Sequence, residues 1–146
     1  MGPEVWAPRL EAANVLFFGG GNTFHLMHWM EKSGLAKLLP ELLKTRVYVG
    51  ISAGSCMAGP TIYNKVQNLF GEKYGLQIKK GLGLVDFQFI PHLNSPDFKK
   101  IREINLREAA KELTEAVYAM DDNSAIWVVD GGVEVVSEGK YLIIEN

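Results

Sequence analysis

The feature that most constrains this chain is the run of small residues from Gly50 to Gly54, with the letters GISAG, which follows an apolar segment. In a G-x-S-x-G turn between a strand and a helix, the serine adopts a strained backbone conformation, and only small neighbours let the chain reverse so tightly. The sequence therefore predicts a nucleophile elbow that presents the Ser52 hydroxyl at the carboxyl end of a strand. An ordinary strand-to-helix turn is the alternative interpretation.

Length and composition predict one soluble globular domain over residues 1–146. The chain is long enough to bury a core without disulfides or metals, and 47% of its residues are apolar and 22% are charged. The formal net charge of −2 gives no electrostatic reason to bind nucleic acid or an anionic membrane. These values exclude strongly basic nucleic-acid binders and membrane-spanning proteins as first hypotheses.

Other compositional signals predict a cytoplasmic protein without cofactors. Cys56 is the only cysteine, which fits a reducing compartment, and no basic region followed by an apolar run opens the chain. His25 and His28 lie three residues apart, but no carboxylate or cysteine at ligand spacing accompanies them. We therefore expect no metal site.

Hydrophobic periodicity predicts strands that alternate with helices, followed by an antiparallel meander. The predicted strands are Val15–Phe18, Arg46–Val49, Leu84–Ile90 and Val117–Met120, with helices at Phe24–Lys32, Leu35–Lys44, Ala53–Ala58 and Phe98–Glu115. The closing strands are Ala125–Val129, Val133–Val136 and Tyr141–Ile144, and a long loop covers Tyr63–Gly83. This order indicates an α/β fold with a mostly parallel sheet, flanking helices and an antiparallel edge.

A reactive serine needs a base, and His92 is the best placed histidine. It follows the predicted strand ending at Ile90, and the carboxyl ends of parallel strands meet at one edge of a sheet, where the elbow also lies. An acid should orient this histidine, and the sequence leaves its identity open. The candidates are Glu72, Asp86, Asp121 and Asp122.

The glycine run Gly19–Gly21 follows the first strand and has neither the spacing of a dinucleotide fingerprint nor a phosphate-binding lysine. Glycines at a strand end let backbone N–H groups approach a reacting carbonyl. We therefore expect this run to supply one oxyanion-hole donor, with the Ala53 N–H as the second.

Three motifs together resemble peptidase family S51, the group of peptidase E (aspartyl dipeptidase) and cyanophycinase in the class I glutamine amidotransferase-like superfamily. They are Phe17–Phe24 (FFGGGNTF), Gly50–Gly54 (GISAG) and Ile90–His92 (IPH), in the family's order. The resemblance implies a serine peptidase that acts on small peptides with an amino-terminal aspartate. It implies Ser52 as nucleophile, His92 as base, Gly20, Gly21 and Ala53 as oxyanion hole, and Asn22 and Arg102 as substrate-binding residues.

Two departures from the family pattern shape the remaining expectations. Where the family has its acid, this chain has Gln67 and Asn68, and a shifted alignment places Glu72 in that role. The family also carries strands and helices before the glycine run that this chain lacks, which would leave part of a sheet uncovered. We therefore expect a homodimer in which a second copy covers that surface.

Two other functions remain open from the sequence. A catalytically weak or inactive relative could keep the fold as a binding or assembly module. An amidotransferase or small-molecule hydrolase could use the same scaffold.

Overall fold

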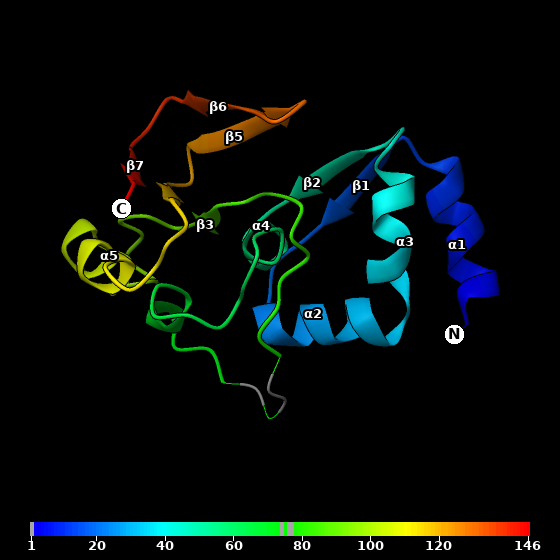
Figure 1. The fold of residues 1–146 in the computed structure, drawn as a ribbon, viewed down its shortest axis with the longest axis horizontal. Coiled ribbons are helices and arrows are strands. Elements are labelled where there is room, and N and C mark those ends of the chain that lie inside the picture. The colour runs from blue at the N-terminus through cyan, green and yellow to red at the C-terminus, as the bar shows by residue number, and fades with distance from the viewer. Residues whose placement is uncertain (1, 74, 76–77) are drawn as a thin grey trace.

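The computed structural model describes residues 2–73, 75 and 78–146 as a mixed α/β fold (Figure 1). Three helices gather around β1 and β2, whereas α5 lies beside the strands of the second half of the chain. In chain order the elements are α1 (Pro3–Ala12), β1 (Val15–Phe18), α2 (Thr23–Lys32), α3 (Leu35–Leu42), β2 (Val47–Gly50), α4 (Ala53–Cys56), η1 (Gln67–Phe70), β3 (Gln88–Ile90), α5 (Glu103–Ala110), β4 (Val117–Met120), β5 (Ser124–Val129), β6 (Gly132–Ser137) and β7 (Tyr141–Ile144).

The first half is built on the parallel pair of β1 and β2, in which Val15 lies opposite Val47 and Phe18 opposite Gly50. Alternation along a strand sends neighbouring side chains to opposite faces of the sheet. One face of this pair packs on the apolar sides of α2 and α3. The buried residues of the resulting core include Leu16, Met27, Met30, Leu39 and Met57. This core fixes β2, the strand that leads into the elbow.

The second half has its own sheet, in the order β3, β4, β7. β3 and β4 are parallel with Ile90 opposite Ala119, and β7 pairs antiparallel with β4. A second apolar core lies between this sheet and α5, and its buried members include Val66, Ile90, Ile101, Leu106 and Val117. The parallel register brings the segments after β3 and β4 to the same edge.

The short helix α4 joins the two halves, because it contacts β1 and β2 on one side and β3 on the other. Its residues Ala53, Gly54 and Cys56 are buried. Small side chains let the helix lie close to strands of both halves. The elbow therefore stands where the two cores meet.

The structure confirms the predicted α/β class and the exact bounds of the strands at Val15–Phe18 and Val117–Met120. The predicted meander is wrong in its pairing. β5 and β6 form a separate hairpin, and β7 returns to β4 instead of extending that hairpin. β7 can do so because Asp121 accepts the N–H of Lys140 and holds the chain at the start of β7 beside the end of β4.

The helix predicted over Phe98–Glu115 is also shorter than its pattern suggests, because α5 begins only at Glu103. Arg102 has extended backbone dihedrals, and its guanidinium donates to the carbonyls of Ser95, Phe98 and Ile101. These bonds hold residues 95–102 as a folded loop. Most of the loop predicted at Tyr63–Gly83 lacks regular structure apart from η1, and its residues 74, 76 and 77 lie outside the described residues.

Two apolar surfaces remain exposed. The outer face of β1 and β2 exposes Val15, Phe17 and Val47, and the β5–β6 hairpin exposes Trp127, Val129 and Val136. Among the described residues, no helix is long and apolar enough to cross a membrane.

Candidate active site

Ser52 forms a strained elbow between β2 and α4. Its φ of 54° and ψ of −116° lie in a region that L-residues rarely adopt, so the surrounding chain must enforce them. The Ile51 N–H donates to the Phe18 carbonyl at 2.9 Å, and the Gly54 N–H donates to the Gly19 carbonyl at 3.0 Å. These bonds fasten both sides of Ser52 to the end of β1.

The glycines around the elbow are required for steric reasons. A Cβ on Gly54 would lie 2.1 Å from the Phe18 carbonyl oxygen, and a Cβ on Gly50 would lie 2.6 Å from the Gly54 oxygen. Backbone atoms cannot move aside as a flexible side chain can. The G-x-S-x-G spacing is therefore what allows the elbow to sit so close to β1.

Ser52, His92 and Asp122 form a continuous hydrogen-bonded chain. The Ser52 Oγ lies 3.0 Å from His92 Nε2, and His92 Nδ1 lies 2.9 Å from Asp122 Oδ1. A carboxylate at Nδ1 favours the tautomer in which Nε2 is free to accept a proton from the serine. This arrangement has the geometry of a nucleophile, a base and an orienting acid.

The His92 ring is held by its backbone and by an aromatic neighbour. His92 has a φ of 65°, and the N–H of Leu93 donates to the Met120 carbonyl, which ties the segment after β3 to the end of β4. The ring of Phe98 stacks on the imidazole with 4.4 Å between centroids and 9° between planes. Phe98 therefore limits rotation of the imidazole.

Asp121 and Asp122 are neighbours with different contacts. Asp121 Oδ1 accepts the Ser124 hydroxyl at 2.7 Å and the Asn123 N–H at 3.0 Å. The Ser124 hydroxyl and the N–H groups of Lys140 and Asn123 hold the pKa of Asp121 below its usual value, although burial opposes them. Asp121 thus organises the turn, while the Asp122 side chain, 69% exposed, points to His92.

Glu72, predicted from the sequence as the acid, lies at another place in the site. Its Oε1 accepts the backbone N–H of Thr23 at 3.1 Å and the Thr23 hydroxyl at 3.2 Å, at the start of α2. Asp86 precedes β3, at the opposite end of that strand from His92. The structure brings neither carboxylate to the histidine, because the turn after β4 occupies that position.

The two residues expected to bind substrate have internal partners. Asn22 caps α2 by accepting the His25 N–H, and its amide donates to the Lys73 carbonyl. Both terminal nitrogens of Arg102 donate to the main-chain carbonyls of its own loop. The contacts of Arg102 therefore explain a folded loop, and they leave no terminal nitrogen without a partner.

The glycine run lies directly against Ser52. A Cβ on Gly20 would lie 3.4 Å from Ser52 Cβ and 3.7 Å from its Oγ. Among the residues that the structure describes, the N–H groups of Gly20, Gly21 and Ala53 donate to no protein acceptor. Unpaired donors beside a nucleophile are what an oxyanion hole requires.

Two groups beside the elbow, the buried Cys56 and the half-buried Tyr48, remain protonated. Burial raises the pKa of the Cys56 thiol to about 12, and burial also raises the pKa of Tyr48. Tyr48 donates its hydroxyl hydrogen to the Gly54 carbonyl and supports the elbow from below. Cys56 is thus a packing residue, since the thiolate is the reactive form of cysteine.

Comparison with known proteins supports one family. The profile of peptidase family S51 matches residues 5–136. The chain belongs to peptidase family S51. Its fold resembles a solved structure of a candidate peptidase E protein from Listeria monocytogenes EGD-e, with a TM-score of 0.78 and 26% identity, over 95% of this chain and 67% of that one.

Two relatives illustrate the extent of the match. An uncharacterized peptidase of Listeria monocytogenes is 30% identical over 132 residues, which cover 89% of this chain and 62% of the relative. Peptidase E of Streptomyces coelicolor is 32% identical over 138 residues, which cover 90% of this chain and 55% of the relative. The S51 chain thus spans little more than half the length of these relatives.

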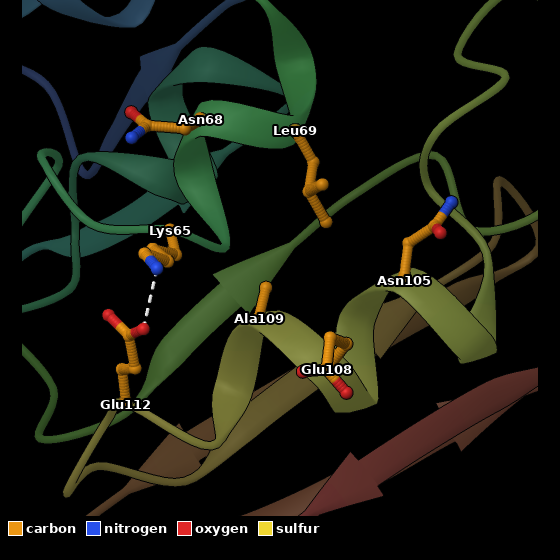
Figure 2. A pocket seen from close by; sticks show the side chains of 7 residues that line it. All are labelled: Lys65, Asn68, Leu69, Asn105, Glu108, Ala109 and Glu112. Carbon is orange, nitrogen blue, oxygen red and sulfur yellow. Dashed lines mark hydrogen bonds and ion pairs between the residues drawn. The ribbon is translucent and has the colours of Figure 1, made fainter.

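A surface groove of about 400 Å³ lies apart from the elbow at Ser52 (Figure 2). It runs between η1 and α5, and an ion pair between Lys65 and Glu112 crosses one end. Its lining residues are Lys65, Asn68, Leu69, Asn105, Glu108, Ala109 and Glu112. None of the residues of the Ser52–His92–Asp122 chain lines this groove.

Sequence reasoning missed Phe98 and left Asp122 as one of several acids. A signal for Asp122 was present, because it follows β4, the parallel neighbour of β3, and the carboxyl ends of such strands meet. Phe98 carried no comparable signal, since its apolar spacing matched a helix. In the part of the S51 chain that the structure describes, no group of three or more His, Cys, Asp or Glu side chains could hold a metal ion.

Proposed function

We propose that this protein is a serine peptidase that cleaves small peptides through an acyl-enzyme. The observation that carries the proposal is the hydrogen-bonded chain from Ser52 Oγ through both ring nitrogens of His92 to Asp122. Membership of family S51 supports the same chemistry. The proposal covers both the three residues and the reaction, because a serine with a base and an orienting acid is suited to acyl transfer.

In the proposed mechanism, Ser52 Oγ attacks the carbonyl carbon of the peptide while His92 Nε2 takes the hydroxyl proton. Asp122 accepts the Nδ1–H and stabilises the imidazolium that forms. The N–H groups of the glycine run and of Ala53 donate to the oxyanion. His92 then gives the proton to the leaving amine, and a water molecule, activated by the same histidine, releases the acid and restores Ser52.

For the substrate we propose small peptides with an amino-terminal aspartate. The support is the resemblance to the aspartyl dipeptidase group and the name peptidase E carried by several relatives. Arg102, expected to meet the acidic side chain, has main-chain partners instead. The specificity therefore rests on the relatives more than on a residue of this site.

The test is hydrolysis of Asp-X dipeptides by wild type and by Ser52→Ala. We expect wild type to release aspartate and the variant to lose this activity. Release of aspartate at equal rates by both proteins would overturn the role of Ser52. Cleavage of other peptides but not of Asp-X would overturn only the specificity, and cleavage of amides or esters alone would favour a small-molecule hydrolase. No hydrolysis of any of these by wild type would favour the inactive binding module.

We further propose that two copies associate through the outer face of β1 and β2. Val15, Phe17 and Val47 are each more than half exposed there, and a contiguous apolar patch of this kind is typical of an interface. The small net charge of −2 does not oppose self-association. Sedimentation equilibrium should give a dimer that Phe17→Lys converts to monomer, whereas a wild-type monomer at micromolar concentration would contradict it.

A further inference from the structure

We propose that Glu72 is a positioning residue that holds the oxyanion loop in place. The proposal rests on the proposed function for its kinetic consequences, but its structural part stands on contacts alone. Glu72 belongs to the segment between α4 and β3, whereas the loop it contacts lies between β1 and α2, 49 residues earlier. The contact therefore joins two segments that are distant along the chain.

The carboxylate binds the first residue of α2 by two hydrogen bonds. Its Oε1 accepts the Thr23 backbone N–H at 3.1 Å and the Thr23 hydroxyl at 3.2 Å. The first N–H groups of a helix have no partner within the helix, and an anion at this end is also favoured by the helix dipole. Glu72 thus acts as a capping group supplied from a remote part of the chain.

A second bond joins the same two segments one residue away. Asn22 Nδ2 donates to the Lys73 carbonyl at 3.3 Å, while Asn22 Oδ1 accepts the His25 N–H at 3.0 Å. Successive residues, Asn22 and Thr23, are therefore bound to successive residues, Glu72 and Lys73. This double connection fixes the carboxyl-terminal end of the loop Gly19–Gly21.

The other end of that loop is fixed by the elbow itself, where the Gly19 carbonyl accepts the Gly54 N–H. Between the two fixed ends lie Gly20 and Gly21, whose N–H groups are the proposed oxyanion donors. Glycine leaves the backbone free to rotate, and Gly21 has a φ of 113° with no atom within 4 Å of a hypothetical Cβ. No side chain packs where a Cβ of Gly21 would lie, so we expect the orientation of this residue to depend on the two anchors.

The expected consequence concerns the transition state. Oxyanion donors act only when they point at the charge that develops during reaction, so loosening one anchor should lower kcat more than it raises KM. Glu72 does not contact His92, so the pH dependence of the reaction should not change when it is replaced. These two features distinguish a positioning residue from a catalytic acid.

The experiment compares Glu72→Ala, Glu72→Gln and Glu112→Gln. Glutamine keeps an oxygen that can accept both Thr23 donors, and alanine removes it. Glu112→Gln is a matched control, because Glu112 also binds the segment between α4 and β3, through its ion pair with Lys65, but does so at the groove in Figure 2. Thr23→Val, which removes only the hydroxyl donor, serves as a milder variant in case Glu72→Ala does not fold.

Two readouts are measured on each variant. The first is amide hydrogen exchange of residues 20–24 by NMR, which needs no activity. The second is kcat and KM for dipeptide hydrolysis across pH. We expect Glu72→Ala to exchange the Thr23 amide at least about tenfold faster and to lower kcat roughly tenfold, with an unchanged pH profile. Glu72→Gln should restore most of the amide protection and of kcat. Thr23→Val should give values between those of wild type and Glu72→Ala, and Glu112→Gln should match wild type.

Each contrary result has a separate meaning. Wild-type exchange and kcat in Glu72→Ala and Thr23→Val would overturn the positioning role. A pH profile that changes in Glu72→Gln as it does in Asp122→Asn would overturn it in favour of a catalytic carboxylate. If wild type and Ser52→Ala hydrolyse equally, the peptidase proposal fails, and the exchange of the Thr23 amide still decides whether Glu72 holds the loop.

Discussion

The two ends of the proposed site are built by different means. At the elbow, backbone hydrogen bonds and glycine contacts hold Ser52 against β1, and the adjoining residues of α4 are buried. At the other end, His92 and Asp122 stand on the turns after β3 and β4 and are joined by a side-chain hydrogen bond, with the Asp122 side chain 69% exposed. The first end tolerates almost no change in shape, whereas the second can lose a group without losing the fold. Mutations at the elbow should therefore lower the stability of the fold, whereas mutations at the His92–Asp122 end should lower activity and leave stability nearly unchanged.

The largest effect is expected from Gly54→Ala at the elbow. Its Cβ would lie 2.1 Å from the Phe18 carbonyl oxygen, so β1 and α4 must move apart. We expect a loss of about 3 kcal/mol in the free energy of unfolding, measured by urea denaturation, and no detectable peptidase activity. Gly19→Ala is the stability control, because the nearest atom beyond the adjacent residues would be a Phe17 ring carbon 4.0 Å from the new Cβ. Equal stability of the two variants would contradict the rigid elbow.

Asp122→Asn should have the next largest effect, on activity alone. The amide cannot enforce the productive histidine tautomer, and we expect kcat/KM to fall by roughly 10³-fold. The melting temperature should stay close to that of wild type, because this side chain is mostly exposed. Activity close to wild type would show that another group orients His92.

Phe98→Ala should produce an intermediate effect on the same end of the site. The stacked ring restrains the imidazole, and its loss should lower kcat/KM by about tenfold as His92 samples other rotamers. Phe98→Leu keeps apolar volume without a flat ring and separates packing from stacking. Full activity of the alanine variant would mean that the His92 backbone alone sets the ring position.

The smallest effect is expected from Asp121→Asn, which weakens the turn that carries Asp122. The pKa of Asp121 is lowered in the folded state, so its ionised form stabilises the fold above the ordinary value of 3.8, and this contribution is lost as pH falls through the lower folded value. The side chain is only partly buried, so water screens its charge and the melting temperature at pH 7 should fall by only a few degrees. Thermal scans should show the difference from wild type shrinking below pH 3.8. A constant difference at all pH values would assign the effect to shape instead of charge.

The contrast between the ends also explains what the sequence could predict. The elbow is encoded locally, since five consecutive residues specify its steric needs. The short apolar runs Val15–Phe18 and Val117–Met120 likewise give β1 and β4 with their exact bounds. The acid depends on which turns meet across the sheet, so Glu72 and Asp122 were both compatible with the sequence. The start of α5 was misplaced because Phe98 and Ile101 have helical spacing, whereas Arg102 binds the carbonyls of residues 95–101 and keeps them in a loop.

The positive φ values of Ser52 and His92 have a consequence for how this sequence could change over time. With φ angles of 54° and 65°, both positions would be less strained with glycine. For Ser52, glycine would relieve strain on the order of 1 kcal/mol. A lineage with no use for the reaction would gain stability from such replacements, and nothing would select against them. Two non-glycine residues nevertheless occupy these positions within hydrogen-bonding distance of each other, as the proposed peptidase reaction requires.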